Sequence, residues 1–95
     1  MRLIVLTNRA SVAERNALTA FLEGKGWSVW HWFEDAWLIA DAPEMAGFSR
    51  LKQEISAAIP TLREFMIIST HDTENQRYSI RASPDGIPWI KEHWK

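Results

Sequence analysis

The sequence predicts one small α+β domain in which two helices cover one face of a four-stranded sheet. Apolar runs of strand length are separated by two segments in which apolar residues recur at helical spacing. A chain of 95 residues has room for one hydrophobic core but not for two. We therefore expect a single domain over residues 1–95, with its core in residues 2–70 and a C-terminal strand and tail in residues 76–95.

The first two elements are a strand and a helix. Leu3–Leu6 is a continuous apolar run, which is typical of a strand covered on both faces. Ser11 followed by Glu14 is a capping-box pattern and predicts the start of a helix. Gly24 and Gly26 end this helix, because glycine adopts the left-handed conformation at little cost. The apolar stripe of the helix is expected to be Val12, Leu18, Phe21 and Leu22.

A β-hairpin is expected over Trp27–Ala40. The polar pair Glu34-Asp35 forms its turn. In the first arm Trp30 and Trp32 alternate with His31 and therefore lie on the opposite face of the sheet. This hairpin supplies the second and third strands.

A second helix and a fourth strand follow. Asp41–Glu44 has the composition of a helix start, with Pro43 near the first helical position. Pro60 ends the helix, because proline lacks the backbone donor and clashes with the preceding turn. Phe65–Ile68 is the fourth strand. The apolar positions of the helix are expected to be Met45, Phe48, Leu51, Ile55 and Ile59.

The C-terminal segment predicts one more strand and a short helix. Residues 77–82 alternate between polar and apolar side chains, as in a half-exposed strand. Ser83–Gly86 is a turn, and Pro88 begins one or two helical turns within Ile87–Lys95. The complete order is that of a ferredoxin-like βαββαβ two-layer sandwich with an extra C-terminal strand and a short terminal helix.

Two helices leave the second face of such a sheet uncovered, although two of its strands are apolar on both faces. A large exposed apolar surface is unusual on a monomer, so the tail or another molecule should cover it. The six tryptophans suggest a surface that something else buries, and a partner chain could be that cover. The candidate residues for such an interface are Trp30, Trp32, Trp37, Tyr78 and Ile80, and the alternative is a tail that folds back over its own sheet.

The sequence Trp30-His31-Trp32, followed by Trp37-Leu38-Ile39, a helix and a last apolar strand, resembles the SinR-like small proteins. These are relatives of the small subunit of the CRISPR adaptation complex, and Ile87–Trp94 is similar to their tryptophan-containing tail. The resemblance implies a ferredoxin-like fold and a homodimer formed by sheet surfaces and the extra strand. In nuclease-competent relatives an acidic residue at the end of the first strand helps to bind a catalytic metal. Thr7-Asn8 stands at that place here and has no carboxylate, which argues against metal-dependent cleavage.

Charge and composition exclude several classes of protein. The net charge of −1 argues against a generally basic nucleic-acid coat, and the absence of cysteine excludes disulfide frameworks and thiolate metal sites. Leu3–Leu6 is too short for a signal peptide or a membrane span, so we expect a cytoplasmic protein without membrane association. The four glycines form no phosphate or dinucleotide motif, and no cofactor or metal is expected.

Local nucleic-acid contacts are a separate hypothesis. Arg77 and Arg81 lie on one face of the fifth predicted strand, and Asn8-Arg9 follows the first. These residues could bind phosphates while Trp30 or Trp32 stacks on bases. The alternative is a solvated strand edge whose charges prevent unwanted pairing.

Isolated histidines and acids give little support for catalysis. His31 could act as a general base or stack on a nucleobase, but we favour a packed, hydrogen-bonded side chain. His71-Asp72 and Glu34-Asp35 lack the spacing that a metal site needs, and loop solvation accounts for both pairs.

The sequence therefore favours a non-catalytic homodimeric interaction module of the SinR-like type, with a nucleic-acid or protein partner or a role in phage-host defence. The first alternative is a metal-dependent endoribonuclease that uses Asn8, His71 or Asp72. The second is a small phage-encoded inhibitor of a host defence complex.

Overall fold

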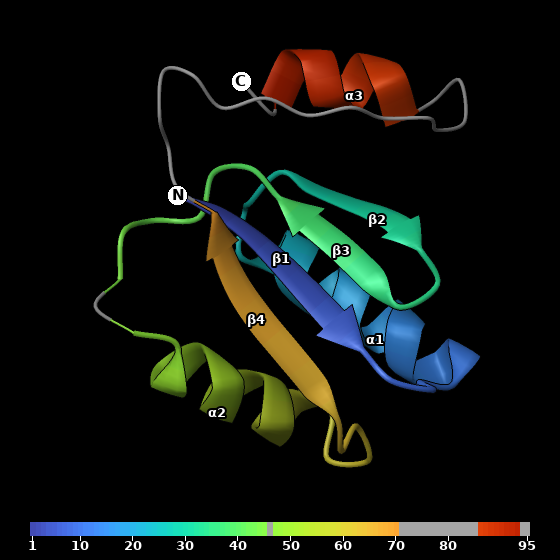
Figure 1. The fold of residues 1–95 in the computed structure, drawn as a ribbon. Coiled ribbons are helices and arrows are strands. Elements are labelled where there is room, and N and C mark those ends of the chain that lie inside the picture. The colour runs from blue at the N-terminus through green and yellow to red at the C-terminus, as the bar shows by residue number, and fades with distance from the viewer. Residues whose placement is uncertain (46, 71–85, 94–95) are drawn as a thin grey trace.

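The protein has a small α+β fold with a four-stranded antiparallel sheet (Figure 1). The computed structural model describes residues 1–45, 47–70 and 86–93. The predicted fifth strand with Arg77, Tyr78, Ile80 and Arg81, and the pair His71-Asp72, lie outside the described residues. The elements are β1 (Arg2–Thr7), α1 (Val12–Gly24), β2 (Val29–Phe33), β3 (Ala36–Ile39), α2 (Ser49–Ala58), β4 (Phe65–Thr70) and α3 (Gly86–His93).

The strand order is β2-β3-β1-β4, and every neighbouring pair is antiparallel. β1 therefore lies inside the sheet, which agrees with its apolar sequence. All six residues of β4 pair with β1 without interruption. The β2-β3 ladder is irregular between His31 and Phe33. Within the described residues, β2 and β4 are the two edges of the sheet.

The main core lies between one face of the sheet and the helices α1 and α2. Leu3 and Val5 of β1 have no exposed surface, and Leu18 and Leu22 pack on them from α1. Ile55 of α2 belongs to the same cluster. Both helices thus cover one face, as the sequence predicts. No helix in the described part of the chain has the length and apolar character needed to cross a membrane.

The predicted start of α1 is confirmed. The Ser11 hydroxyl accepts a hydrogen bond from the Glu14 backbone N–H (3.1 Å), and the Glu14 carboxylate accepts one from the Ser11 N–H (2.9 Å). Gly26 has a φ of 79°, whereas the helix itself ends at Gly24. The prediction for Val12 is wrong, because this first helical residue is 67% exposed and does not contribute to the buried stripe.

The predicted start of α2 is also wrong, since the helix begins at Ser49 and not within Asp41–Glu44. The Asp41 carboxylate, which could have capped a helix, accepts hydrogen bonds from the backbone N–H and the hydroxyl of Ser28. Asp41 is therefore bound to the hairpin, and Met45 packs on the core without helical structure. The predicted end is close to the observed one, because α2 stops at Ala58, before Pro60.

Trp37 lies in the helix-facing core. Its side chain is fully buried, and its indole N–H donates to the Thr19 hydroxyl of α1 (2.9 Å). The His31 ring stacks on it with a centroid distance of 4.3 Å. The His31 Nε2–H donates to the Glu34 carbonyl (2.8 Å), so His31 is a packed, hydrogen-bonded residue. The Trp37 side chain does not reach the surface of this chain, so it has no exposed area to contribute to the predicted dimer interface.

Candidate functional site

The second face of the sheet is covered in part by α3. Trp89 of α3 packs near Trp30 of β2 at a ring-centroid distance of 5.7 Å, and both join a small cluster around the buried Leu38. Trp30 stacks on Trp32 at 5.0 Å, and Trp89 contacts His93 at 5.1 Å. We call this group of rings the aromatic column. It holds the C-terminal helix on β2.

The aromatic column is a poor platform for nucleobases. Trp30 has Trp32 and Trp89 as ring neighbours, and Trp32 has Trp30 and Phe33. A base can stack only on a ring face that is free. Contacts within the chain already engage the two tryptophans that were expected to bind bases or a partner.

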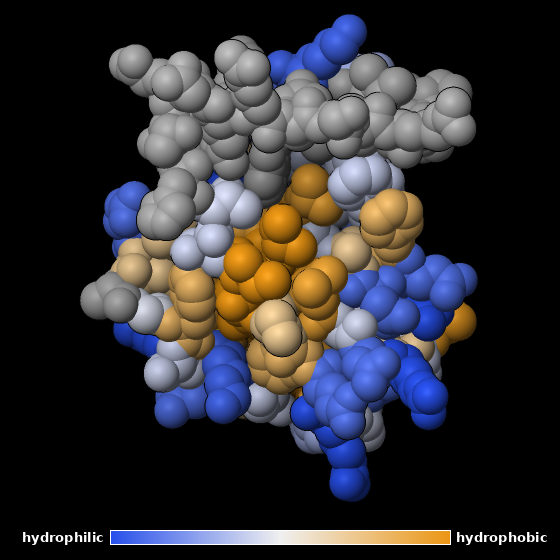
Figure 2. All heavy atoms as spheres, viewed as in Figure 1, coloured by the Kyte–Doolittle hydropathy of each residue, from blue (hydrophilic) through white to orange (hydrophobic). Residues whose placement is uncertain are grey.

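The other half of this face, over β1 and β4, is apolar and open (Figure 2). In the β1-β4 ladder Ile4 lies directly opposite Ile68, and Leu6 lies directly opposite Met66. Met66 is 57% exposed and Ile68 is 38% exposed, while Ile4 and Leu6 are half-buried. We call these four residues the open patch. Two adjacent cross-strand pairs make it a continuous surface rather than scattered single residues.

The open patch extends to the edge of the sheet, because β4 is the outermost strand on that side within the described residues. Phe65–Thr70 contains no charged residue and no proline. It pairs with β1 over its full length without a bulge. Natural edge strands usually carry charged residues, prolines or bulges, which prevent pairing with other chains. β4 therefore has the properties of a strand that can accept another strand.

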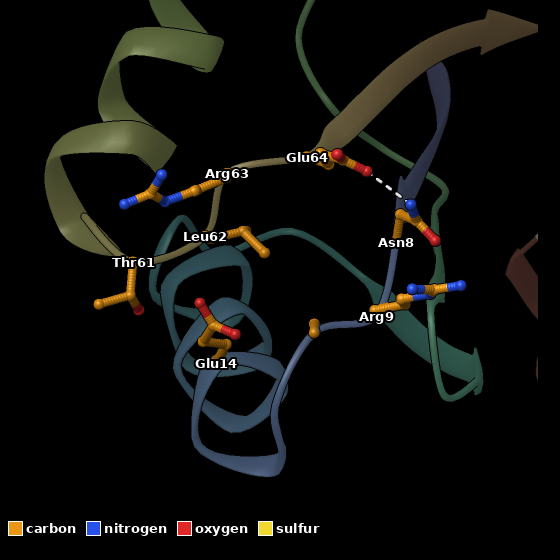
Figure 3. Close-up of a pocket in the computed structure, with 8 residues that line it drawn as sticks. Asn8, Arg9, Glu14, Thr61, Leu62, Arg63 and Glu64 are labelled. Atoms are coloured by element: carbon orange, nitrogen blue, oxygen red, sulfur yellow. Dashed lines mark hydrogen bonds between the residues drawn. The ribbon is translucent and has the colours of Figure 1, made fainter.

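A polar pocket of about 290 Å³ lies where β1 ends, near the start of α1 and the loop before β4 (Figure 3). Asn8 and Arg9, two of the predicted nucleic-acid contacts, both line it. Arg9 has a φ of 55°, in the left-handed region. The Asn8 backbone N–H donates to the Glu64 carbonyl (3.2 Å), and the Asn8 side-chain amide donates to the Glu64 carboxylate. The end of β1 is thus attached to the start of β4.

The charges of this pocket are balanced. Glu14 and Glu64 line it together with Arg9 and Arg63, and the two arginine side chains point away from each other (Figure 3). Hydrogen bonds from the Ser11 backbone and the Thr61 side chain lower the pKa of Glu14, so this carboxylate stays charged. Within residues 1–45, 47–70 and 86–93, no three histidine or acidic side chains gather as metal ligands. The pocket therefore does not present a concentration of positive or of negative charge to a ligand.

The hairpin turn is held on α1 and is not a free loop. The Thr7 hydroxyl donates to the Asp35 carboxylate (2.6 Å), and the Arg15 Nε lies 3.6 Å from the same oxygen. The Arg15 guanidinium also lies 3.7 Å from the Glu34 carboxylate. Glu34 remains largely exposed, whereas Asp35 is a structural residue. Loop solvation therefore accounts for Glu34 but not for Asp35.

The Thr7-Asp35 hydrogen bond predicts a pH-dependent contribution to stability. It lowers the pKa of Asp35 below its ordinary value of 3.8, with smaller contributions from the Ala10 N–H and Arg15. A carboxylate with a lowered pKa stabilises the fold above its unfolded-state pKa, and this stabilisation is lost as the pH falls through the folded-state pKa. Thr7→Val should therefore destabilise the protein at about pH 6, and the difference from the unmodified chain should shrink below pH 3.8. Urea unfolding at a series of pH values measures this.

Thr70→Val is the matched control. The Thr70 hydroxyl oxygen is buried and has no hydrogen-bond partner among the described residues. Its removal should leave the pH dependence of unfolding unchanged. An equal pH-dependent loss in both variants would show that the effect does not come from Asp35.

Comparison of the chain with protein-family models, with curated proteins and with solved structures finds no match. The site must therefore be judged from its own geometry. The open patch was not among the predicted site residues, which lay in the hairpin, in the C-terminal strand and at the end of the first strand. Its signal was present, since positions 4, 6, 66 and 68 are apolar in strands whose other face is buried.

Proposed function

We propose that the protein is a non-catalytic interaction module that self-associates as a homodimer through the open patch and the β4 edge. The observation that carries this proposal is the pair of exposed apolar residues Met66 and Ile68 on an uncharged edge strand. Contiguous exposed apolar surface is a mark of protein contacts. The interface we propose lies on β1 and β4, not on the tryptophans of the hairpin.

We also propose that the domain is ferredoxin-like and of the SinR-like type. In support, the sheet order from the other edge is β4-β1-β3-β2, with all neighbours antiparallel, and the chain order through β4 is βαββαβ. The helices α1 and α2 share one face. The resemblance of the Trp30–Trp32 and Trp37–Ile39 segments to SinR-like proteins is the reason for the narrower assignment.

The open patch is too small to stabilise a dimer alone. Complete burial of a large apolar side chain contributes about 1.5–3 kcal/mol, and Ile4 and Leu6 are already half-buried. Association costs about 4–15 kcal/mol in lost translational and rotational freedom. A stable dimer therefore needs contacts beyond the four residues of the open patch.

Met66→Lys tests the proposal. It places an ammonium group on the most exposed residue of the patch, and the two copies then bring like charges together. We expect the dimer dissociation constant to rise at least about tenfold, which is ~1.4 kcal/mol. Sedimentation equilibrium over a range of concentrations measures this change.

Val12→Lys is the matched control, because Val12 is also an apolar residue and is 67% exposed but lies on α1. It should leave the dissociation constant unchanged. A monomeric unmodified protein, or equal weakening by both variants, would contradict the proposal.

A further inference from the structure

We infer that the self-association proposed above joins the β4 strands of two copies, antiparallel to each other about a two-fold axis at Ile67. This inference rests on the proposed function and specifies the partner and the register. The two four-stranded sheets would become one continuous antiparallel sheet.

The direction of the backbone groups of β4 follows from its pairing with β1. The Asn8 N–H donates to the Glu64 carbonyl, so Asn8 and Glu64 are a hydrogen-bonded pair. Leu6 with Met66, and then Ile4 with Ile68, are the next alternate pairs along the same ladder. Hydrogen-bonded and non-hydrogen-bonded pairs alternate along an antiparallel ladder. The backbone N–H and C=O groups of Met66 and Ile68 therefore form hydrogen bonds with β1.

The alternate residues of β4 direct their backbone groups away from β1. These residues are Phe65, Ile67 and Ser69, and their N–H and C=O groups point toward the outer edge. Within the described residues no strand pairs with that edge. Edge groups of this kind pair readily with another strand.

The register follows from two requirements. Outward-directed residues must pair with outward-directed residues, and residues directly opposite each other must point to the same face. Centring the axis on Ile67 places each Ile67 opposite its copy and Phe65 opposite Ser69 of the second copy. Met66 then lies opposite Ile68 of the second copy in a non-hydrogen-bonded pair, where side chains are closest. This register pairs the exposed apolar residues with each other, whereas centring on Ile68 would pair Met66 with Thr70.

A second copy suits this edge better than a charged or irregular strand. β4 has no charge that would repel its own copy, and the Ile67-centred pairing is self-complementary, as a two-fold interface requires. On the helix side of the same edge, a groove of about 280 Å³ is lined by Phe48, Phe65 and Ile67 together with Ser49 and Lys52. Pairing of two β4 edges would thus bury apolar side chains on both faces of the sheet, which supplies the contacts that the open patch lacks.

Disulfide trapping tests the register, because the chain contains no cysteine. We would prepare Met66→Cys and Ile68→Cys separately, tag one of them to change its mass, and oxidise them alone and mixed. In the proposed register the Cα atom at position 66 lies about 4.5 Å from the Cα atom at position 68 of the other copy, within the range of disulfides. Identical positions lie diagonally, about 7–8 Å apart. The mixture should therefore form several-fold more covalent dimer than either variant alone.

Val12→Cys is the control for random collision and should form little covalent dimer. Hydrogen exchange of the unmodified chain provides a second readout. The Ile67 and Ser69 amides should be protected at concentrations where the dimer forms and exchange faster on dilution.

The possible outcomes separate the two proposals. Efficient cross-linking of Ile68→Cys alone would overturn the register in favour of an axis at Ile68. A dimer in sedimentation without cross-links in the mixture, and with rapidly exchanging Ile67 and Ser69 amides, would overturn the strand pairing but leave the homodimer intact. A protein that stays monomeric at all concentrations would overturn the proposed function itself.

Discussion

Replacing Trp37 with alanine is expected to lower the free energy of unfolding by about 3–5 kcal/mol. The indole is completely buried between β3 and α1, so its removal leaves a cavity in the main core. The change also removes the donor to the Thr19 hydroxyl and the ring on which His31 stacks. Urea unfolding followed by circular dichroism measures the loss.

Trp30→Ala is the matched control, because it removes the same side chain from the other face of the sheet. Trp30 is only partly buried and packs on Trp32 and on Trp89 of α3. We expect a smaller loss of stability and weaker attachment of α3. A Trp37→Ala variant that keeps its stability but fails to associate would indicate that Trp37 is an interface residue and not a core residue.

Val5→Asp is expected to prevent folding. Val5 has no exposed surface and lies in the inner strand β1, facing the helices. A buried carboxylate without a partner costs several kcal/mol even after relaxation, which is comparable to the total stability of a small domain of about 5–15 kcal/mol. Far-ultraviolet circular dichroism should show loss of the native spectrum.

Leu6→Asp is the control at the neighbouring position of the same strand. Leu6 points to the open patch and is half-buried, so the carboxylate retains contact with water. This variant should remain folded. Equal unfolding of both variants would contradict the assignment of the two faces of β1.

Local signals in the sequence predicted much of the fold. The Ser11-Glu14 capping box, the Glu34-Asp35 turn and the stop at Pro60 each depend on neighbouring residues only, and the structure contains all three features. The start of α2 could not be predicted in this way. The Asp41 carboxylate binds Ser28, a residue 13 positions away, and this contact forms only in the folded hairpin.

The residue that lies opposite Trp37 in the hairpin depends on an irregularity that the sequence pattern does not reveal. Phe33 pairs with Ala36 next to the turn, and continued regular pairing would place Trp32 opposite Trp37. The bulge shifts the register by one residue, so that His31 lies opposite Trp37. A shift of one residue moves a side chain to the other face of the sheet. Trp37 itself lies opposite the buried Val5 of β1 and therefore faces the helices, and the bulge in β2 places the His31 ring beside it.

The candidate site was predictable only in part for the same reason. The continuous apolar runs of β1 and β4 predicted two apolar faces for each strand, and the sequence therefore predicted an uncovered surface. It did not show that α3 would cover the tryptophans of β2 and leave Met66 and Ile68 exposed. Packing of this kind depends on residues distant in the chain.

The bulge in β2 also bears on how large an assembly this chain can form. If two copies join through β4, the outer borders of the combined sheet are two β2 strands. Each has an interrupted ladder and carries α3 beside it, which hinders the addition of further strands. Growth would therefore end at two chains, and a filament of endlessly extended sheet would be avoided.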